Sequence, residues 1–178
     1  YYREDQFYTA YLEQAKAVAA AGVDAFIVET ATDLREALCA LKVCRENFKL
    51  PVVVSMSFST VKEGGRTMMG DRAAACAEAL EAGGADAAGI NCGEFDPRRA
   101  HEVVRTFRRA CSLPLLAVPN AGRPRLEKGR TVYDMPPDIF AHEVVRPCIE
   151  AGARLLGGCC GTTPEHIRAV AEMISQDR

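Results

Sequence analysis

Two adjacent cysteines, Cys159 and Cys160, stand in the segment GGCCGTTP with glycines on both sides. A packing role needs one small hydrophobic side chain, whereas two neighbouring thiols offer two metal ligands or a redox pair. Adjacent residues of an extended chain point to opposite sides, so both sulfurs reach one ion only where the backbone bends. Gly157, Gly158 and Gly161 permit such a bend.

A third thiol, Cys92, closes the apolar segment AAGINC, just as Cys159 and Cys160 follow the apolar segment ARLL. In parallel α/β folds the carboxyl ends of the strands share one edge, where ligands bind. We therefore predict that the three thiols form one cluster. Three thiolates suit tetrahedral Zn²⁺, and three protein ligands leave one position open, as in catalytic zinc sites.

Other interpretations of these thiols stay open at this point. Cys159 and Cys160 could form a vicinal disulfide or be two unrelated core thiols, and Cys92 alone is typical of a buried strand cysteine. A redox role is less favoured because the pair lacks the Cys-X-X-Cys spacing. The prediction that all three lie at one edge favours zinc.

The remaining five cysteines are spread along the chain rather than packed as in a small secreted scaffold. All fall in helical patterns, where a free cysteine behaves as a small core hydrophobe. We expect free thiols in a reducing, cytoplasmic setting. These residues are Cys39, Cys44, Cys76, Cys111 and Cys148.

Composition excludes several classes of protein. The 178 residues suffice for one domain with a core, and 48% hydrophobic with 26% charged residues argues against disorder. The net charge of −2 comes without a basic patch, so no nucleic-acid partner is expected. No run is long and apolar enough to cross a membrane, and the first residues do not resemble a signal peptide.

Short apolar runs alternate with amphipathic segments, which predicts parallel strands covered by helices. Two architectures compete: an open doubly wound sheet and a TIM-type (β/α)₈ barrel. No glycine-rich dinucleotide fingerprint follows any strand, so nucleotide binding is not favoured. The predicted strands are 25–30, 50–58, 87–92, 113–120 and 153–158. Six helices are predicted, the first ending at Gly22 and the others at 33–47, 71–86, 98–111, 138–152 and 165–176, with a long loop at 121–136.

Polar residues gather where these strands end. The first strand ends in Glu29 and Thr30, the second contains Ser55, the third ends in Asn91, and Asn120 follows the fourth. We expect them on the same edge as the cysteines.

The segments GINCG, PNAGRP and GGCCGTTPEHIRAV, in this order, resemble the homocysteine S-methyltransferase family. That family includes the homocysteine-binding module of cobalamin-dependent methionine synthase and betaine–homocysteine methyltransferase. AGVDAFIVETATDLREAL and GRTVYDMPPDIFA are similar to further family segments, and the likeness runs through essentially the whole chain.

The resemblance implies a (β/α)₈ barrel with zinc held by Cys92, Cys159 and Cys160. It implies that Glu29 holds the substrate amino group and that Asn120 offers an oxygen near the metal when substrate is absent. Ser55 is predicted as a further substrate-binding residue. Simpler roles stand beside these: Asn120 as a turn residue after a proline, and Glu29 as an acidic residue before a helix.

Only five of the eight barrel strands are predicted, together with six helices. The chain thus resembles the last five βα units of the barrel, as a single partial domain over 1–178. We expect a fragment of a longer chain; closure by a second copy is the alternative.

The implied reaction is zinc-dependent methyl transfer to the thiol of homocysteine, forming methionine. Betaine, S-methylmethionine and methylcobalamin fed by methyltetrahydrofolate are all candidate donors, and the sequence does not distinguish them. The alternative is a zinc-binding fragment without catalysis of its own.

Overall fold

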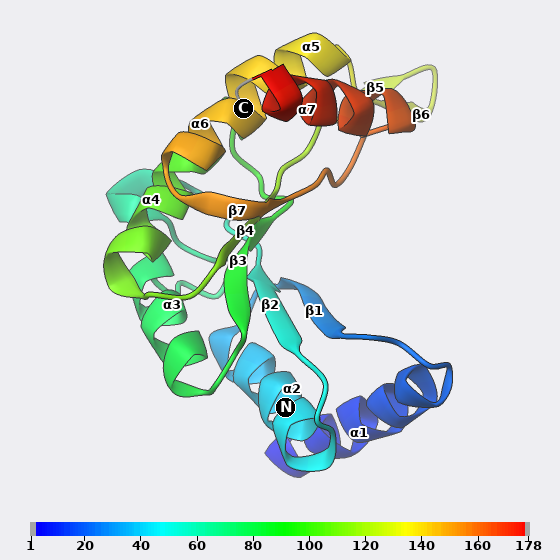
Figure 1. Cartoon of the computed structure of the whole chain (residues 1–178), viewed down its shortest axis with the longest axis vertical. Coiled ribbons are helices and arrows are strands. Elements are labelled where there is room, and N and C mark those ends of the chain that lie inside the picture. Colours follow the sequence, from blue (N-terminus) through cyan, green and yellow to red (C-terminus); the bar gives the residue numbers. More distant parts are fainter. Residues whose placement is uncertain (1–2, 177–178) are drawn as a thin grey trace.

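Five parallel strands form one sheet in the order β1-β2-β3-β4-β7 in the computed structural model, which describes residues 3–176 (Figure 1). Each neighbouring pair is parallel. Helices join consecutive strands, which confirms the predicted alternation. The strands are β1 (Phe26–Ala31), β2 (Val52–Met56), β3 (Ala87–Asn91), β4 (Leu115–Val118) and β7 (Ala153–Leu156).

Six helical segments accompany the sheet, as predicted. The fifth is continuous but changes its winding, because a π-helical stretch lies just before Pro147, which has no N–H to donate. The segments are α1 (Glu4–Ala20), α2 (Leu34–Asn47), α3 (Ala73–Ala82), α4 (Ala100–Ala110), the run α5 (Pro137–Ile139), η3 (Phe140–Val145) and α6 (Arg146–Glu150), and α7 (Pro164–Gln176). Two short 3₁₀ turns are η1 (Lys62–Gly64) and η2 (Pro97–Arg99).

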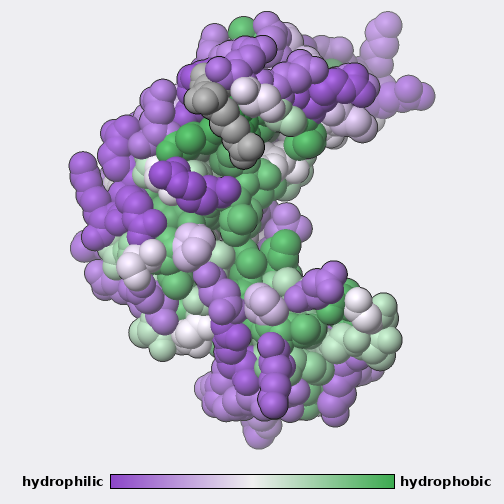
Figure 2. Space-filling view, in the orientation of Figure 1, coloured by the Kyte–Doolittle hydropathy of each residue, from purple (hydrophilic) through white to green (hydrophobic). Residues whose placement is uncertain are grey.

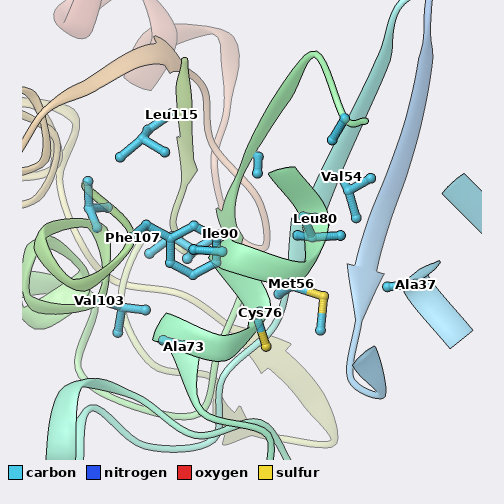
Figure 3. Close-up of a cluster of buried hydrophobic side chains, with 14 of the residues drawn as sticks. Ala37, Val54, Met56, Ala73, Cys76, Leu80, Ile90, Val103, Phe107 and Leu115 are labelled. Atoms are coloured by element: carbon cyan, nitrogen blue, oxygen red, sulfur yellow. The ribbon is translucent and has the colours of Figure 1, made fainter. Parts of the chain in front are cut away.

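The main core lies between the sheet and the helices that cover its outer face (Figure 3). Met56 and Ile90 from the strands meet Leu80 of α3 and Phe107 of α4, and all four side chains are buried. A second cluster packs the α5–α6 segment against α7 around Phe140. The predicted helical cysteines are buried in or beside these clusters, and no disulfide joins any cysteine of the described chain.

The opposite face of the sheet is open, so the molecule is hollowed on one side (Figure 2). Within residues 3–176, β1 and β7 each pair with one strand only. Ile27 on β1 is 61% exposed and Leu155 on β7 is 40% exposed. The five-stranded parallel sheet is confirmed, whereas a closed eight-stranded barrel stays a prediction.

The loop predicted at 121–136 contains a two-stranded antiparallel hairpin, so that prediction was wrong in part. Strands β5 (Arg125–Glu127) and β6 (Arg130–Val132) are joined by Lys128 and Gly129, both with positive φ, as a two-residue hairpin turn requires. Both strands are short and largely exposed, and each has a single apolar residue, Leu126 or Val132, so no hydrophobic alternation marks them.

No helix within residues 3–176 has both the length and the apolar character needed to span a membrane.

Candidate metal centre at the strand ends

The strand order brings the three predicted cysteines together. Cys92 directly follows β3, Cys159 and Cys160 follow β7, and β4 lies between these two strands. The Cys92 backbone N–H donates to the Val118 carbonyl at 3.1 Å, and that of Cys159 donates to the Pro119 carbonyl at 2.9 Å. The end of β4 therefore holds both cysteine segments in place.

The spacing of the sulfurs fits one tetrahedral metal ion. Cys160 Sγ lies 3.8 Å from Cys159 Sγ and 4.0 Å from Cys92 Sγ. All three sulfurs lie within 4.8 Å of one another. Two sulfurs bound to one zinc at about 2.3 Å with tetrahedral angles stand about 3.8 Å apart. Among the described residues this is the only group of three or more Cys, His, Asp or Glu side chains with such spacing.

Unusual backbone conformations turn the sulfurs toward one another. Cys92 has φ of 55°, in the left-handed region that residues other than glycine rarely adopt. Gly161, just after the cysteine pair, has φ of 80°. The positive φ of Gly161 agrees with the bend predicted beside the cysteine pair, whereas the strained conformation of Cys92 was not predicted.

Burial and charge disfavour a free thiolate at Cys159. Burial raises the pKa of the Cys159 thiol to about 11, and repulsion from Cys92 adds to the rise. A hydrogen bond from Asn91 Nδ2 to Cys159 Sγ, at 3.9 Å, acts in the opposite direction. A cation bound at this position would lower the pKa of the thiol, because it stabilises the thiolate form.

Asn120 joins the two cysteine segments to each other. Its Oδ1 accepts a hydrogen bond from the Cys160 N–H at 3.1 Å, and its Nδ2 donates to the Gly93 carbonyl at 3.4 Å. The residue lies beside the cluster, as predicted, although its amide oxygen already has a protein partner. Its role toward a metal or substrate stays a prediction.

Glu29 and Ser55 occupy different environments at the same edge. Glu29 is exposed and lines a cavity of about 540 Å³ between β1 and the helices α1 and α2. Ser55 is fully buried, and its hydroxyl donates to Asn91 Oδ1 at 2.6 Å. Glu29 is therefore accessible to a ligand, whereas Ser55 contacts the site through Asn91. Neither substrate-binding role is tested by this geometry.

The structure adds three residues to which the sequence assigns no role. Asn91 and Thr30 hydrogen-bond to each other at the strand ends. Tyr133, just after the hairpin, lies against Gly161, where an added Cβ would fall 2.3 Å from Tyr133 Cγ. Burial and a hydrogen bond with Cys160 raise the pKa of Tyr133. Thr30 and Asn91 are signalled in the sequence by their places at the ends of predicted strands, and Tyr133 by nothing local.

Known proteins resemble this chain over nearly its whole length. The family model described as "Homocysteine S-methyltransferase" matches residues 1–174. The methionine synthase of Mycobacterium leprae is 34% identical over 172 residues, which are 94% of this chain and 14% of that protein. The methionine synthase of Mycobacterium tuberculosis is also 34% identical, over 93% of this chain and 14% of its own length. The chain thus spans about one seventh of these relatives.

Solved structures share the fold. The metallated form of the homocysteine methyltransferase MmuM from Escherichia coli superposes with a TM-score of 0.77 at 22% identity, covering 97% of this chain and 53% of that one. Its apo form gives a TM-score of 0.76 over 97% and 57%. The sequence match over nearly the whole chain establishes the relationship: the chain belongs to the homocysteine S-methyltransferase family.

Proposed function

We propose that this chain forms the zinc-binding part of an enzyme that transfers a methyl group to the sulfur of homocysteine, forming methionine. The observation that carries the proposal is the spacing of three cysteine sulfurs, 3.8 and 4.0 Å apart along two sides, at the carboxyl ends of parallel strands. Family membership and the fold shared with a metallated homocysteine methyltransferase support it.

Cys92, Cys159 and Cys160 would hold the ion and leave its fourth position for the substrate. When bound, zinc would keep the homocysteine thiol deprotonated at neutral pH, although a free thiol titrates near pH 8.5. Three cysteine thiolates give the metal site a net charge of −1. Because these ligands are anionic, the metal would withdraw little electron density from the substrate sulfur. With neutral ligands it would withdraw more, and the sulfur would be a weaker nucleophile.

The other groups of the site would bind and orient the substrate. Glu29 is exposed at the end of β1 and offers a carboxylate to the ammonium group of an amino acid. The homocysteine proton would pass to solvent, which reaches the exposed Cys160. The sulfur then forms a bond to the methyl carbon, while the donor's leaving atom takes the electron pair of the breaking bond. This step depends on alignment of three atoms and needs no general base.

The methyl donor lies outside what these residues specify. Betaine, S-methylmethionine and methylcobalamin with methyltetrahydrofolate remain candidates. The methionine synthases that match this chain are much longer, so their full activity is not transferred to it.

We also propose that the sheet is part of an eight-stranded TIM-type barrel. Residues 1–178 would then all belong to one domain. The support is the open face and the exposed Ile27 and Leu155 on the two outer strands, since unpaired edges are an aggregation hazard. Further strands of a longer chain would cover both edges, and a second copy is the alternative source. A reducing, cytoplasmic location would keep the site thiols free.

A zinc-binding fragment without catalysis is the second candidate. The open side of the sheet favours it, because the cavity beside Glu29 is lined by β1, α1 and α2 and by no residue of the cysteine cluster. Turnover measurements distinguish the two.

The test compares Cys92→Ser with Cys39→Ala, a control that changes a cysteine of α2 outside the cluster. Zinc content and methionine formation are measured with each donor in turn. We expect Cys39→Ala to keep its zinc and its rate of methionine formation. Cys92→Ser should lose at least 100-fold in zinc content and in methionine formation, because one of three ligands is gone. Zinc binding without turnover by any donor would favour the non-catalytic fragment. Full activity of a zinc-free variant would contradict the proposed mechanism.

A further inference from the structure

Asn91 uses both atoms of its side-chain amide within the site and is 1% exposed. Its Oδ1 accepts from Ser55 Oγ at 2.6 Å and from the Thr30 N–H at 3.0 Å. Its Nδ2 donates to Thr30 Oγ1 at 2.6 Å and to Cys159 Sγ at 3.9 Å. One buried amide therefore links the ends of β1 and β2 to a sulfur of the metal cluster.

The contact with Thr30 holds an unfavourable backbone conformation. Thr30 has φ of 62°, which is costly for a β-branched residue. The pairing register between β1 and β2 also shifts between Val28 and Ala31, the stretch that contains Thr30. Two hydrogen bonds between Asn91 and Thr30, one donated by each residue, compensate for this irregularity. The conformation of the strand end that carries Glu29 thus depends on Asn91.

We infer that Asn91 is a positioning residue that fixes the Cys159 sulfur relative to the end of β1, so that one ligand can occupy the metal and the Glu29 carboxylate together. The inference rests on the proposed function and deepens it. An amide placed only to satisfy its own burial would need no contact with the sulfur. Partners of this kind orient metal ligands, and their loss costs about 10- to 100-fold in metal affinity.

Two substitutions separate the two ends of this link. Asn91→Asp keeps the shape but replaces the Nδ2 donor with an oxygen, so it removes the donor to Cys159 Sγ and forces the Thr30 hydroxyl to donate instead of accept. Thr30→Gly removes the Oγ1 acceptor and suits the positive φ, so it disrupts the β1 side alone and does not strain the fold. Asn47→Asp, the same chemical change at an exposed residue of α2, is the matched control.

The measurements use the 178-residue chain loaded with Co²⁺, whose thiolate charge-transfer absorption reports on the metal–sulfur bonds. Metal loss to a chelator is followed, and the affinity for homocysteine is compared with that for 1-propanethiol, which lacks the amino and carboxylate groups. We expect Asn91→Asp to shift the absorption, to lose metal about 10- to 100-fold faster and to bind homocysteine with less preference over propanethiol. Thr30→Gly should keep its metal within twofold of wild type and still lose at least tenfold of that preference.

Three outcomes would overturn the inference. In the first, Asn91→Asp matches Asn47→Asp in absorption, metal retention and thiol preference. In the second, Thr30→Gly loses metal as fast as Asn91→Asp. In the third, Thr30→Gly keeps the full preference for homocysteine. In each case the wild type still binds metal and homocysteine, so only the inference fails. A wild-type chain that folds but binds no Co²⁺ would instead contradict the proposed function and the inference together.

Discussion

Thiols from two segments far apart in the sequence, Cys92 and the pair Cys159–Cys160, become one ligand set because both segments hydrogen-bond to the end of β4. The sulfur distances of 3.8 and 4.0 Å match those expected around a tetrahedral ion. The cost of this arrangement without metal is visible in Cys159, whose pKa is raised to about 11 by burial and by the neighbouring Cys92. Without a metal, burial and repulsion thus keep Cys159 as a neutral thiol, and a bound cation would stabilise its thiolate form.

This raised pKa predicts a pH-dependent zinc affinity. Below pH 11 the Cys159 thiol is mostly protonated in the metal-free chain, so zinc must displace at least one proton. Affinity should therefore rise with pH, by about tenfold or more per unit between pH 6 and pH 8. Competition with a chelator of known proton affinity measures this slope. An affinity independent of pH would mean that the thiols do not bind as thiolates.

At the residue scale, the sequence predicts the ligands but not the groups that orient them. Cys92, Cys159 and Cys160 are predictable because strand ends converge on one edge of a parallel sheet. The hydrogen bond from Asn91 to Cys159 depends on side-chain directions and on the irregular end of β1, which no local pattern encodes. Tyr133 reaches Cys160 from a hairpin that the sequence does not reveal.

At the scale of elements, the close approach of β3 and β4 determines where the cysteine segments meet. Gly89 of β3 lies so close to β4 that an added Cβ would fall 1.9 Å from the Leu116 carbonyl oxygen. Only glycine fits there, because a backbone atom cannot yield as a flexible side chain does. Separation of these two strands would also move the end of β4, to which Cys92 and Cys159 are hydrogen-bonded.

Gly89→Ala should therefore destabilise the fold by about 3 kcal/mol or more, as expected for overpacking against a rigid neighbour. Gly129→Ala is the control, because Gly129 has positive φ but no atom within 4 Å of an added Cβ. Its cost should be about 1 kcal/mol, the penalty for a left-handed residue alone. Urea unfolding of both variants measures the difference. Equal stabilities would contradict the proposed importance of the β3–β4 approach.

Strongly patterned elements are predictable, and weakly patterned ones are not. The buried strands and the amphipathic helices follow from apolar runs, glycine stops and capping residues. Asp96, for example, caps η2 by accepting from the Arg98 N–H. The hairpin from Arg125 to Val132 escapes prediction because its residues are mostly polar and exposed, so burial imposes no alternation on them.

At the scale of the whole molecule, the metal centre and the exposed Glu29 are carried by different strands of the sheet. The sulfurs are held by β3, β4 and β7, whereas the exposed Glu29 lies on β1, an outer strand. The three thiols should therefore bind metal in the chain as it stands. Substrate binding depends more on what covers the open side, which is where further strands would act.

Zinc content of the folded chain under reducing conditions, with and without homocysteine, tests directly whether Cys92, Cys159 and Cys160 bind zinc. We expect about one zinc per chain. We also expect the release of a proton when homocysteine is added, because the substrate must bind as a thiolate. A folded chain that retains no zinc with its eight cysteines reduced would contradict the assignment of Cys92, Cys159 and Cys160 as the metal site.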